Sequence, residues 1–286
     1  MKTAFWFLKL TIPISLAVTL LNHFGLLQIV SDFLSPAFNL IGVRGEGALV
    51  YITGIFLNVY SSIAVLSSLS FTLREATILA IMSLIAHNLI IETAVQRKTG
   101  SKTIHIILLR IISSIVAAVL LNLFLPVDMG MMKHTSAVTE DSTFWVVLSE
   151  WSINTFFLCI KIVILITLLM ILQKLLVEFR VNQILADIFK PFLKVMGLPE
   201  STSFMWIVAN LLGLAYGSAV MIDEVETGRL SKEDADLLNF HIGISHSNLE
   251  DLLLFATMSI SAGWLLFPRL GIAIVAVWGR RLWISK

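Results

Sequence analysis

The chain has 286 residues, of which 57% are hydrophobic and only 14% are charged. An ordinary soluble domain carries about 25% charged residues, so this composition excludes a water-soluble protein and predicts an all-α polytopic membrane protein. The net charge is +1, and the basic residues form only short clusters, which indicates no nucleic-acid partner. The expected partners are the lipid bilayer and a small-molecule solute.

The predicted membrane spans come first in chain order. A spanning helix needs about 20 mostly apolar residues, and six stretches qualify: 4–22, 75–95, 103–125, 144–172, 232–255 and 262–282. The first resembles a secretory signal, but no small-x-small cleavage site follows it, so we expect a retained span. Phosphate-binding loops, nucleophile elbows and paired cysteines are missing from the sequence, so we expect neither an enzyme nor a bound cofactor.

Two parts of the chain repeat one pattern of polar residues, prolines and glycines. The segment SDFLSPAFNLIGV at 31–43 aligns with ADIFKPFLKVMGL at 186–198, and AHNLIIE at 86–92 aligns with SHSNLED at 245–251. Thr72-x-x-Glu75 and Ser231-x-x-Asp234 align as two helix-capping patterns. We therefore predict a first repeat at 1–126, an extracytoplasmic linker at 127–143 and a second repeat at 144–286.

The charged loops predict how the repeats cross the membrane. If residues 46–69 and 200–222 both crossed fully, the basic loop at 97–102 and the acidic loop at 126–143 would violate the positive-inside rule. If both instead form re-entrant hairpins, the basic loop and both termini are cytoplasmic, while Asp128, Glu140 and Asp141 lie outside. Each repeat then has three spans, one amphipathic interfacial helix and one hairpin, and the second repeat is inverted.

The hairpin segments TGIFLNVYSSIAVL at 53–66 and LLGLAYGSAVMI at 211–222, with the AHN and SHSN segments, resemble the nucleoside-recognition or Gate family. This family includes concentrative nucleoside transporters, ferrous-iron permease pores and spore-maturation membrane proteins. The resemblance implies two Gate-like repeats whose hairpins and broken helices form a pore. The chain lacks the full ribose-binding set of nucleoside transporters and the nucleotide-binding domain of iron permeases, so the resemblance supports transport more than it supports nucleosides.

Polar residues inside the predicted spans mark the candidate site, because polar groups in hydrocarbon line cavities or pair with one another. They lie at the hairpin tips and in the third span of each repeat. The candidate substrate-binding residues are Asn58, Tyr60, Ser61, Ser62, His87, Asn88, Tyr216, Gly217, Ser218, His246, Ser247 and Asn248. The alternative is that these groups bond to the hairpin backbone and only hold the fold.

Buried charges are expected to pair. Glu92 with Arg110 and Asp251 with Arg269 should lie at equal depth on adjacent helices, as structural ion pairs or as proton sites. Glu150 and Lys161 form a looser candidate pair.

A metal site is a weaker alternative, with His87, Glu92, His246 and Glu250 as candidate ligands for a divalent ion.

The leading prediction is a secondary transporter of the bacterial inner membrane that moves a small polar, nucleoside-like solute by alternating access. A proton or sodium gradient would drive it. Three alternatives stay open: a divalent-metal transporter, a carrier of anions or lipid phosphates that uses Arg110 and Arg269, and a non-transporting sensor or assembly subunit. The sequence also leaves open whether the protein forms a homo-oligomer.

Overall fold

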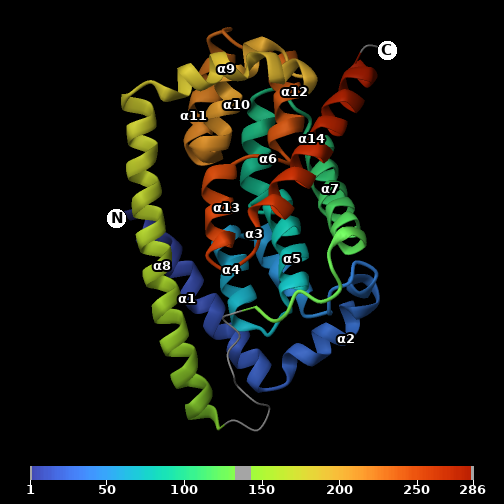
Figure 1. Ribbon diagram of the computed structural model, residues 1–286, viewed down its shortest axis with the longest axis vertical. Coiled ribbons are helices and arrows are strands. Elements are labelled where there is room, and N and C mark those ends of the chain that lie inside the picture. The colour runs from blue at the N-terminus through green and yellow to red at the C-terminus, as the bar shows by residue number, and fades with distance from the viewer. Residues whose placement is uncertain (1, 133–142, 285–286) are drawn as a thin grey trace.

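A computed structural model describes residues 2–132 and 143–284, and these residues form an all-α membrane protein (Figure 1). Within these two ranges the only β-type pairing is one isolated bridge between Thr72 and Met131. The predicted linker positions Glu140 and Asp141 lie outside the described residues.

The first half of the chain begins with a helix that descends to one end of the molecule, where a second helix lies across that end (Figure 1). We call this end the α2 face. The helices are α1 (Lys2–His23), α2 (Leu26–Asn39), α3 (Gly47–Phe56), α4 (Val59–Ser68), α5 (Leu73–Ala86), α6 (Leu89–Lys98) and α7 (Thr103–Phe124).

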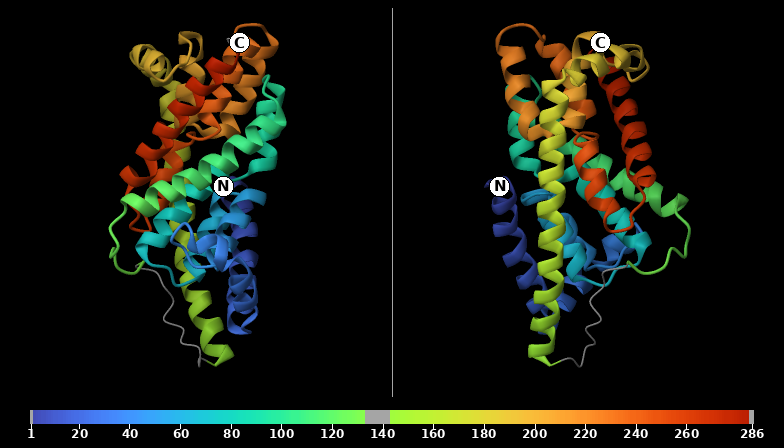
Figure 2. Two further views of the ribbon diagram at one scale, coloured as in Figure 1. Left: turned by 90° about the vertical axis from the view of Figure 1, so that its right-hand side faces the viewer. Right: turned by 60° about the vertical axis from the view of Figure 1, so that its left-hand side comes forward.

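The second half follows the same order of parts from the opposite end. Its long first helix rises from the α2 face, and its second helix lies across the other end, which we call the α9 face (Figures 1 and 2). The elements are α8 (Phe144–Glu178), α9 (Val181–Val195), the 3-10 turn η1 (Glu200–Thr202), α10 (Ser203–Leu211), α11 (Gly213–Glu226), α12 (Lys232–Ile242), α13 (Asn248–Ala256) and α14 (Ala262–Ile284).

Four helices among the described residues are long and apolar enough to cross a membrane: Leu73–Lys98, which joins α5 and α6, then Thr103–Phe124, Phe144–Glu178 and Ala262–Ile284. The stretch predicted at 232–255 is not among them. Its helix α12 begins with Lys232, Glu233 and Asp234, and the chain leaves the helical path before Asn248. In α1, the apolar stretch within the described side chains is Thr11–His23.

Each half contains a helical hairpin whose turn lies in the interior. The first hairpin, α3–α4, turns at Leu57 and Asn58, and the Asn58 side chain caps α4 by accepting from the Ser61 amide at 3.0 Å. The second, α10–α11, turns at Gly213, whose φ of 77° is a left-handed conformation that glycine adopts without strain. The hairpins enter from opposite faces and point toward each other (Figures 1 and 2).

The predicted helix caps are confirmed. Thr72 and Glu75 form a complete capping box at the start of α5, in which the Glu75 carboxylate accepts from the Thr72 amide at 2.9 Å. Ser231 accepts from the Asp234 amide at 3.0 Å at the start of α12. Each cap satisfies an orphan donor of a helix that starts directly after a hairpin.

Aligned positions of the two segments also share their backbone geometry. Gly42 after α2 and Gly197 after α9 have φ angles of 72° and 76°. The following residue bonds back across the helix end in both cases, from Val43 to the Phe38 carbonyl and from Leu198 to the Leu193 carbonyl. This geometry agrees with the alignment of 31–43 with 186–198, whereas the division of the whole chain into two inverted repeats stays a prediction.

Candidate functional site

Two broken helices lie behind the hairpin tips. The chain leaves α5 at His87 and enters α6 after Asn88, and it leaves α12 before Gly243 and enters α13 after Ser247. Asn88 and Ser247 have left-handed φ angles of 50° and 51°. Their amides donate to the hairpins, to the Gly54 carbonyl at 2.8 Å and to the Ala209 carbonyl at 2.9 Å. The hairpins thus hold the breaks through backbone hydrogen bonds.

Two fully buried arginines stabilise the breaks in the same way. Arg110 of α7 donates to the carbonyls of Ile85 at 2.8 Å and His87 at 2.7 Å. Arg269 of α14 donates to the carbonyls of Ile244 at 3.1 Å and His246 at 2.8 Å. Buried carbonyls freed by a helix break need partners, and each guanidinium supplies two donors. The arginines are therefore committed to the backbone, which argues against their use as the main anion-binding groups.

Glu92 is the centre of a buried cluster formed by both halves. Its carboxylate lies 2.8 Å from the Arg110 guanidinium, 3.3 Å from His87 Nε2 and 3.4 Å from His246 Nε2. The two imidazole rings lie with their centroids 5.1 Å apart. We call Glu92, His87, His246 and Arg110 the central cluster. The predicted Glu92–Arg110 pair is present, and it extends to both histidines.

The hydrogen bonds of the histidines limit where their protons lie. His87 Nδ1 faces the Ser83 carbonyl at 3.1 Å, and His246 Nδ1 faces the Ile242 carbonyl at 2.6 Å. A carbonyl only accepts, so each Nδ1 carries a hydrogen, and a neutral ring then presents a lone pair at Nε2. Both Nε2 atoms face the Glu92 carboxylate, which is also an acceptor. Each contact is therefore favourable only when a proton or another cation lies between ring and carboxylate.

The second predicted ion pair, Asp251 with Arg269, is not formed among the described residues. Asp251 is buried, but its Oδ2 atom has no hydrogen-bond partner there, and the same holds for one terminal nitrogen of Arg269. Aspartate is one methylene shorter than the glutamate at the aligned position 92, which reduces its reach. The two halves thus differ at their aligned acidic residues: Glu92 pairs with its arginine, whereas Asp251 forms no such pair among the described residues.

Tyr60 connects the tip of the first hairpin to the second half of the chain. The Tyr60 hydroxyl donates to Glu250 of α13 at 2.6 Å. Glu250 is therefore held at the hairpin and is not part of the central cluster, so its prediction as a metal ligand is wrong for this arrangement. The residues within 4.8 Å that could share a metal are His87, Glu92 and His246.

Other predicted binding residues make contacts within the hairpins. Ser61 bonds to Asn58, and the Ser62 hydroxyl donates to the Val50 carbonyl at 3.1 Å. Gly217 packs closely against Val208 and Ala209.

The remaining predicted residues lie nearer the second break. Asn248 donates to the Asn210 side chain at 2.5 Å. Asn88 and Ser218 are half-buried, while the side chain of Tyr216 lies outside the described part of the structure.

A polar network that the sequence did not indicate joins helices at the α9 face. Asn239 of α12 donates to Thr99 and Ser101, both at 3.0 Å, and Asp236 accepts from Ser101 at 2.6 Å. Asp236 also pairs with Arg280 of α14 at 2.8 Å. We call these five residues the α9-face latch. Asp236 and Asn239 stand three apart on a helix, a spacing that could have indicated a polar face inside the bundle.

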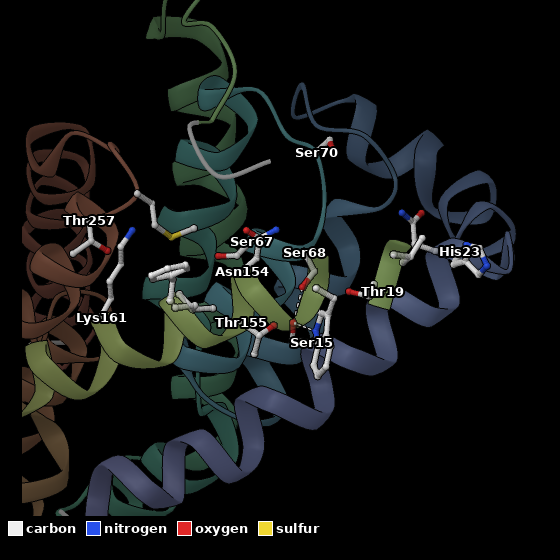
Figure 3. Close-up of a pocket in the computed structure, with 16 residues that line it drawn as sticks. Ser15, Thr19, His23, Ser67, Ser68, Ser70, Asn154, Thr155, Lys161 and Thr257 are labelled. Atoms are coloured by element: carbon white, nitrogen blue, oxygen red, sulfur yellow. Dashed lines mark hydrogen bonds between the residues drawn. The ribbon is translucent and has the colours of Figure 1, made fainter. Parts of the chain in front are cut away.

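A cavity of about 350 Å³ lies between α1, α4, α8 and the end of α13, toward the α2 face (Figure 3). Its wall is rich in hydroxyl groups, and it includes Lys161 of α8. Helix α8 is continuous, so the 11-residue separation of Glu150 from Lys161 corresponds to about 16 Å. The predicted direct pair of these two residues is therefore wrong.

The chain is similar to a protein of Bacillus subtilis named "uncharacterized membrane protein YvoD". The two are 30% identical over 277 residues, which cover 93% of this chain and 86% of the relative. This chain belongs to the YvoD family. No protein-family model and no solved structure matches it. The relationship to YvoD establishes that this YvoD-family chain is a membrane protein.

Proposed function

We propose that the protein is a secondary transporter that moves a small polar solute by alternating access, and not an enzyme. The main support is the central cluster, where two broken helices and two hairpins from opposite faces meet around Glu92. Polar sites between broken helices near the membrane centre are the common plan of secondary transporters. Irregular backbone inside a membrane also requires a buried or wet environment, which favours hairpins that re-enter the membrane around such a site.

The proposed orientation places the α9 face in the cytoplasm of a bacterial-type cell, with the membrane as the inner membrane. The α9 face carries Arg97, Lys98 and Lys102 in the loop before α7, together with Arg280 and Arg281 near the end of α14. The α2 face carries Asp128. The excess of basic residues follows the positive-inside rule.

Differences between the two faces support alternating access. The α9-face latch joins the loop after α6 to α12 and α14 through buried polar bonds. On the α2 side, a cavity lies between helices of both halves. Polar bonds across one face and a cavity toward the other are the asymmetry that one state of an alternating-access transporter would have.

We propose a proton as the coupling ion at the central cluster. The charged groups around it are the buried carboxylates of Glu92 and Asp251, the half-buried carboxylate of Glu250 and the buried guanidinium groups of Arg110 and Arg269. Tyr60 of α4 donates to Glu250. Two lone pairs facing one carboxylate need a cation, and histidine is the side chain that exchanges protons near neutral pH. A proton adds one positive charge to the central cluster, whereas a divalent metal adds two.

A divalent metal is the second candidate, because His87, Glu92 and His246 offer three ligand atoms and both rings are oriented through Nδ1 as in many metal sites. Arg110 already occupies one oxygen of Glu92 at 2.8 Å. A metal would therefore compete with a guanidinium, which makes the proton the better candidate. Nucleosides are the first substrate class to test, on the resemblance to the Gate family alone.

The test is uptake of radiolabelled uridine by proteoliposomes with and without an inward proton gradient. We expect the gradient to accelerate uptake, and we expect Glu92→Gln to abolish that acceleration, because an amide neither holds nor releases the proton. Asp128→Asn, an exposed acidic residue at the α2 face, is the control and should behave as wild type.

Related solutes and metals are tested by thermal stability, since a bound ligand raises the apparent stability of the folded protein. If a panel of nucleosides, nucleobases and Mn²⁺, Fe²⁺ and Zn²⁺ gives neither uptake nor stabilisation, the transporter proposal is wrong and the sensor or assembly-subunit alternative takes its place.

A further inference from the structure

A groove at the α9 face lies between the end of α14 and the start of α12, which meet at that end of the molecule (Figure 1). Its volume is about 380 Å³. Each helix contributes one face, because residues three or four apart on a helix are neighbours. The lining residues are Glu233 and Leu237 of α12 and Trp278, Arg281, Leu282 and Ile284 of α14.

The groove lies where a phospholipid meets the protein. Helix α14 is long and apolar enough to cross a membrane, and Trp278, Leu282 and Ile284 near its end are exposed apolar side chains. A tryptophan at the end of a span lies at the level of the lipid headgroups. The groove is therefore within reach of a headgroup and of the first part of an acyl chain.

The floor of the groove is a tryptophan that the rest of the fold holds in place. The Trp278 indole nitrogen donates to the Val195 carbonyl of α9 at 3.1 Å. A Cβ atom added at Gly197 would lie 3.1 Å from the same ring, so the ring packs against the turn after α9. The Arg281 guanidinium lies 5.7 Å from the centre of this ring, within the range of a cation–π contact. That contact orients the guanidinium without using its N–H donors.

Two opposite charges lie on the two sides of this apolar floor. Glu233 comes from α12 and Arg281 from α14, both are exposed, and no ion pair joins these two described residues to each other. A guanidinium matches a phosphate group through paired N–H donors. A carboxylate accepts hydrogen bonds from an ammonium group. The groove thus complements a ligand that carries a phosphate and an ammonium group next to an apolar chain.

We propose that this groove binds phosphatidylethanolamine, with its phosphate at Arg281, its primary ammonium group at Glu233 and an acyl chain along Leu237 and Leu282. Phosphatidylglycerol has the phosphate but no cation. Phosphatidylcholine has the cation, but its trimethylated nitrogen has no N–H to donate. Both charges of the groove are therefore used fully only by a headgroup with a free ammonium group. The proposal concerns a lipid at the surface of the protein and does not rest on transport at the central cluster.

The experiment measures binding of single lipid molecules to the purified full-length protein by native mass spectrometry. Phosphatidylethanolamine, its N-monomethyl and N,N-dimethyl derivatives, phosphatidylcholine and phosphatidylglycerol, all with the same acyl chains, are titrated separately. We expect phosphatidylethanolamine to bind roughly tenfold more tightly than phosphatidylcholine or phosphatidylglycerol, since each of these lacks a charge-assisted hydrogen bond. Successive N-methylation should weaken binding stepwise.

Variants assign the two charges to the two headgroup groups. Arg281→Gln should weaken every lipid roughly tenfold, because all of them carry the phosphate. Glu233→Gln should remove the dependence on N-methylation and leave phosphatidylethanolamine no tighter than phosphatidylcholine. Arg97→Gln and Glu226→Gln, at exposed positions outside the groove, are the matched controls and should bind like wild type. Arg281→Lys keeps the charge but not the paired donors; it gives a second measurement if Arg281→Gln fails to fold, and should weaken binding several-fold.

Four results would overturn the proposal. The first is that phosphatidylcholine or phosphatidylglycerol binds to the wild type as tightly as phosphatidylethanolamine. The others are a preference for the primary ammonium group that survives Glu233→Gln, foldable Arg281 variants that bind like wild type, and control variants that lose as much affinity as the groove variants. None of these results depends on uridine uptake, so the lipid site and the transporter proposal fail separately.

Discussion

At the residue scale, the interior combines groups that stabilise the fold with groups that are arranged for chemistry. Arg110 and Arg269 each bind two carbonyls at a helix break. Among the residues that the structure describes, Arg110 alone of the two also pairs with a carboxylate, that of Glu92. The two arginines therefore hold equivalent places in the backbone but differ in their electrostatic environment.

This difference predicts unequal effects of matched substitutions. Arg110→Gln removes the partner of a buried carboxylate and should reduce the free energy of unfolding by about 3–5 kcal/mol. Arg269→Gln removes donors to two carbonyls but breaks no ion pair among the described residues, so its cost should be closer to ~1–3 kcal/mol. Thermal or denaturant unfolding of both purified variants measures this. An equal loss, or a larger loss for Arg269→Gln, would contradict the described asymmetry.

Parts of the central cluster could be predicted from the sequence. The aligned His87 and His246 and the pair Glu92–Arg110 follow from the repeat and from the cost of unpaired charge in a membrane. The sequence could not show that Glu92 contacts both histidines, because that depends on how the two halves pack. It also wrongly placed Asp251 with Arg269, since alignment ignores a side-chain difference of one methylene.

At the element scale, the hairpins depend on close contact between their arms. A Cβ atom added at Gly54 of α3 would lie 2.5 Å from the Ser62 hydroxyl of α4. Glycine therefore allows the first hairpin to be narrow enough for its turn to lie inside the molecule.

Gly54→Ala should destabilise the protein by about 1–3 kcal/mol through overpacking. Ser62→Ala removes the clashing oxygen, so the double variant should be more stable than the sum of the single effects predicts. Unfolding of the two single variants and the double variant gives the coupling energy. A coupling of zero would show that the arms are not in contact at this point.

The element-scale features were partly visible in the sequence. The charged loops predicted hairpins and both capping patterns predicted helix starts, and the caps are confirmed. The positions of the helix breaks were harder to predict from the sequence. Asn88 and Ser247 adopt left-handed conformations that only the contact with the hairpin backbone explains.

At the scale of the whole molecule, the account depends on two faces that open in turn. The cavity and the α9-face latch were not predicted from the sequence, since each is assembled from helices that are far apart in the chain. The latch suggests a direct way to change the balance between the two states.

Asp236→Asn weakens the latch at Ser101 and Arg280. In a Cys159→Ser background with Asn88→Cys as reporter, it should increase several-fold the rate of modification by an impermeant thiol reagent added at the α9 face. Arg229→Gln, which breaks exposed pairs with Asp223 and Glu224 on the same side, is the control and should leave the rate unchanged. An equal increase in both variants would exclude a gating role for Asp236.

The central claim is that the two hairpins approach Glu92 from opposite sides of the membrane. Single cysteines at the open ends of the hairpins, Ser70→Cys and Thr227→Cys in a Cys159→Ser background, test it most directly, because both positions are exposed. The account predicts that an impermeant reagent labels Ser70→Cys only from outside the cell and Thr227→Cys only from the cytoplasmic side. Labelling of both cysteines from the same side would contradict it.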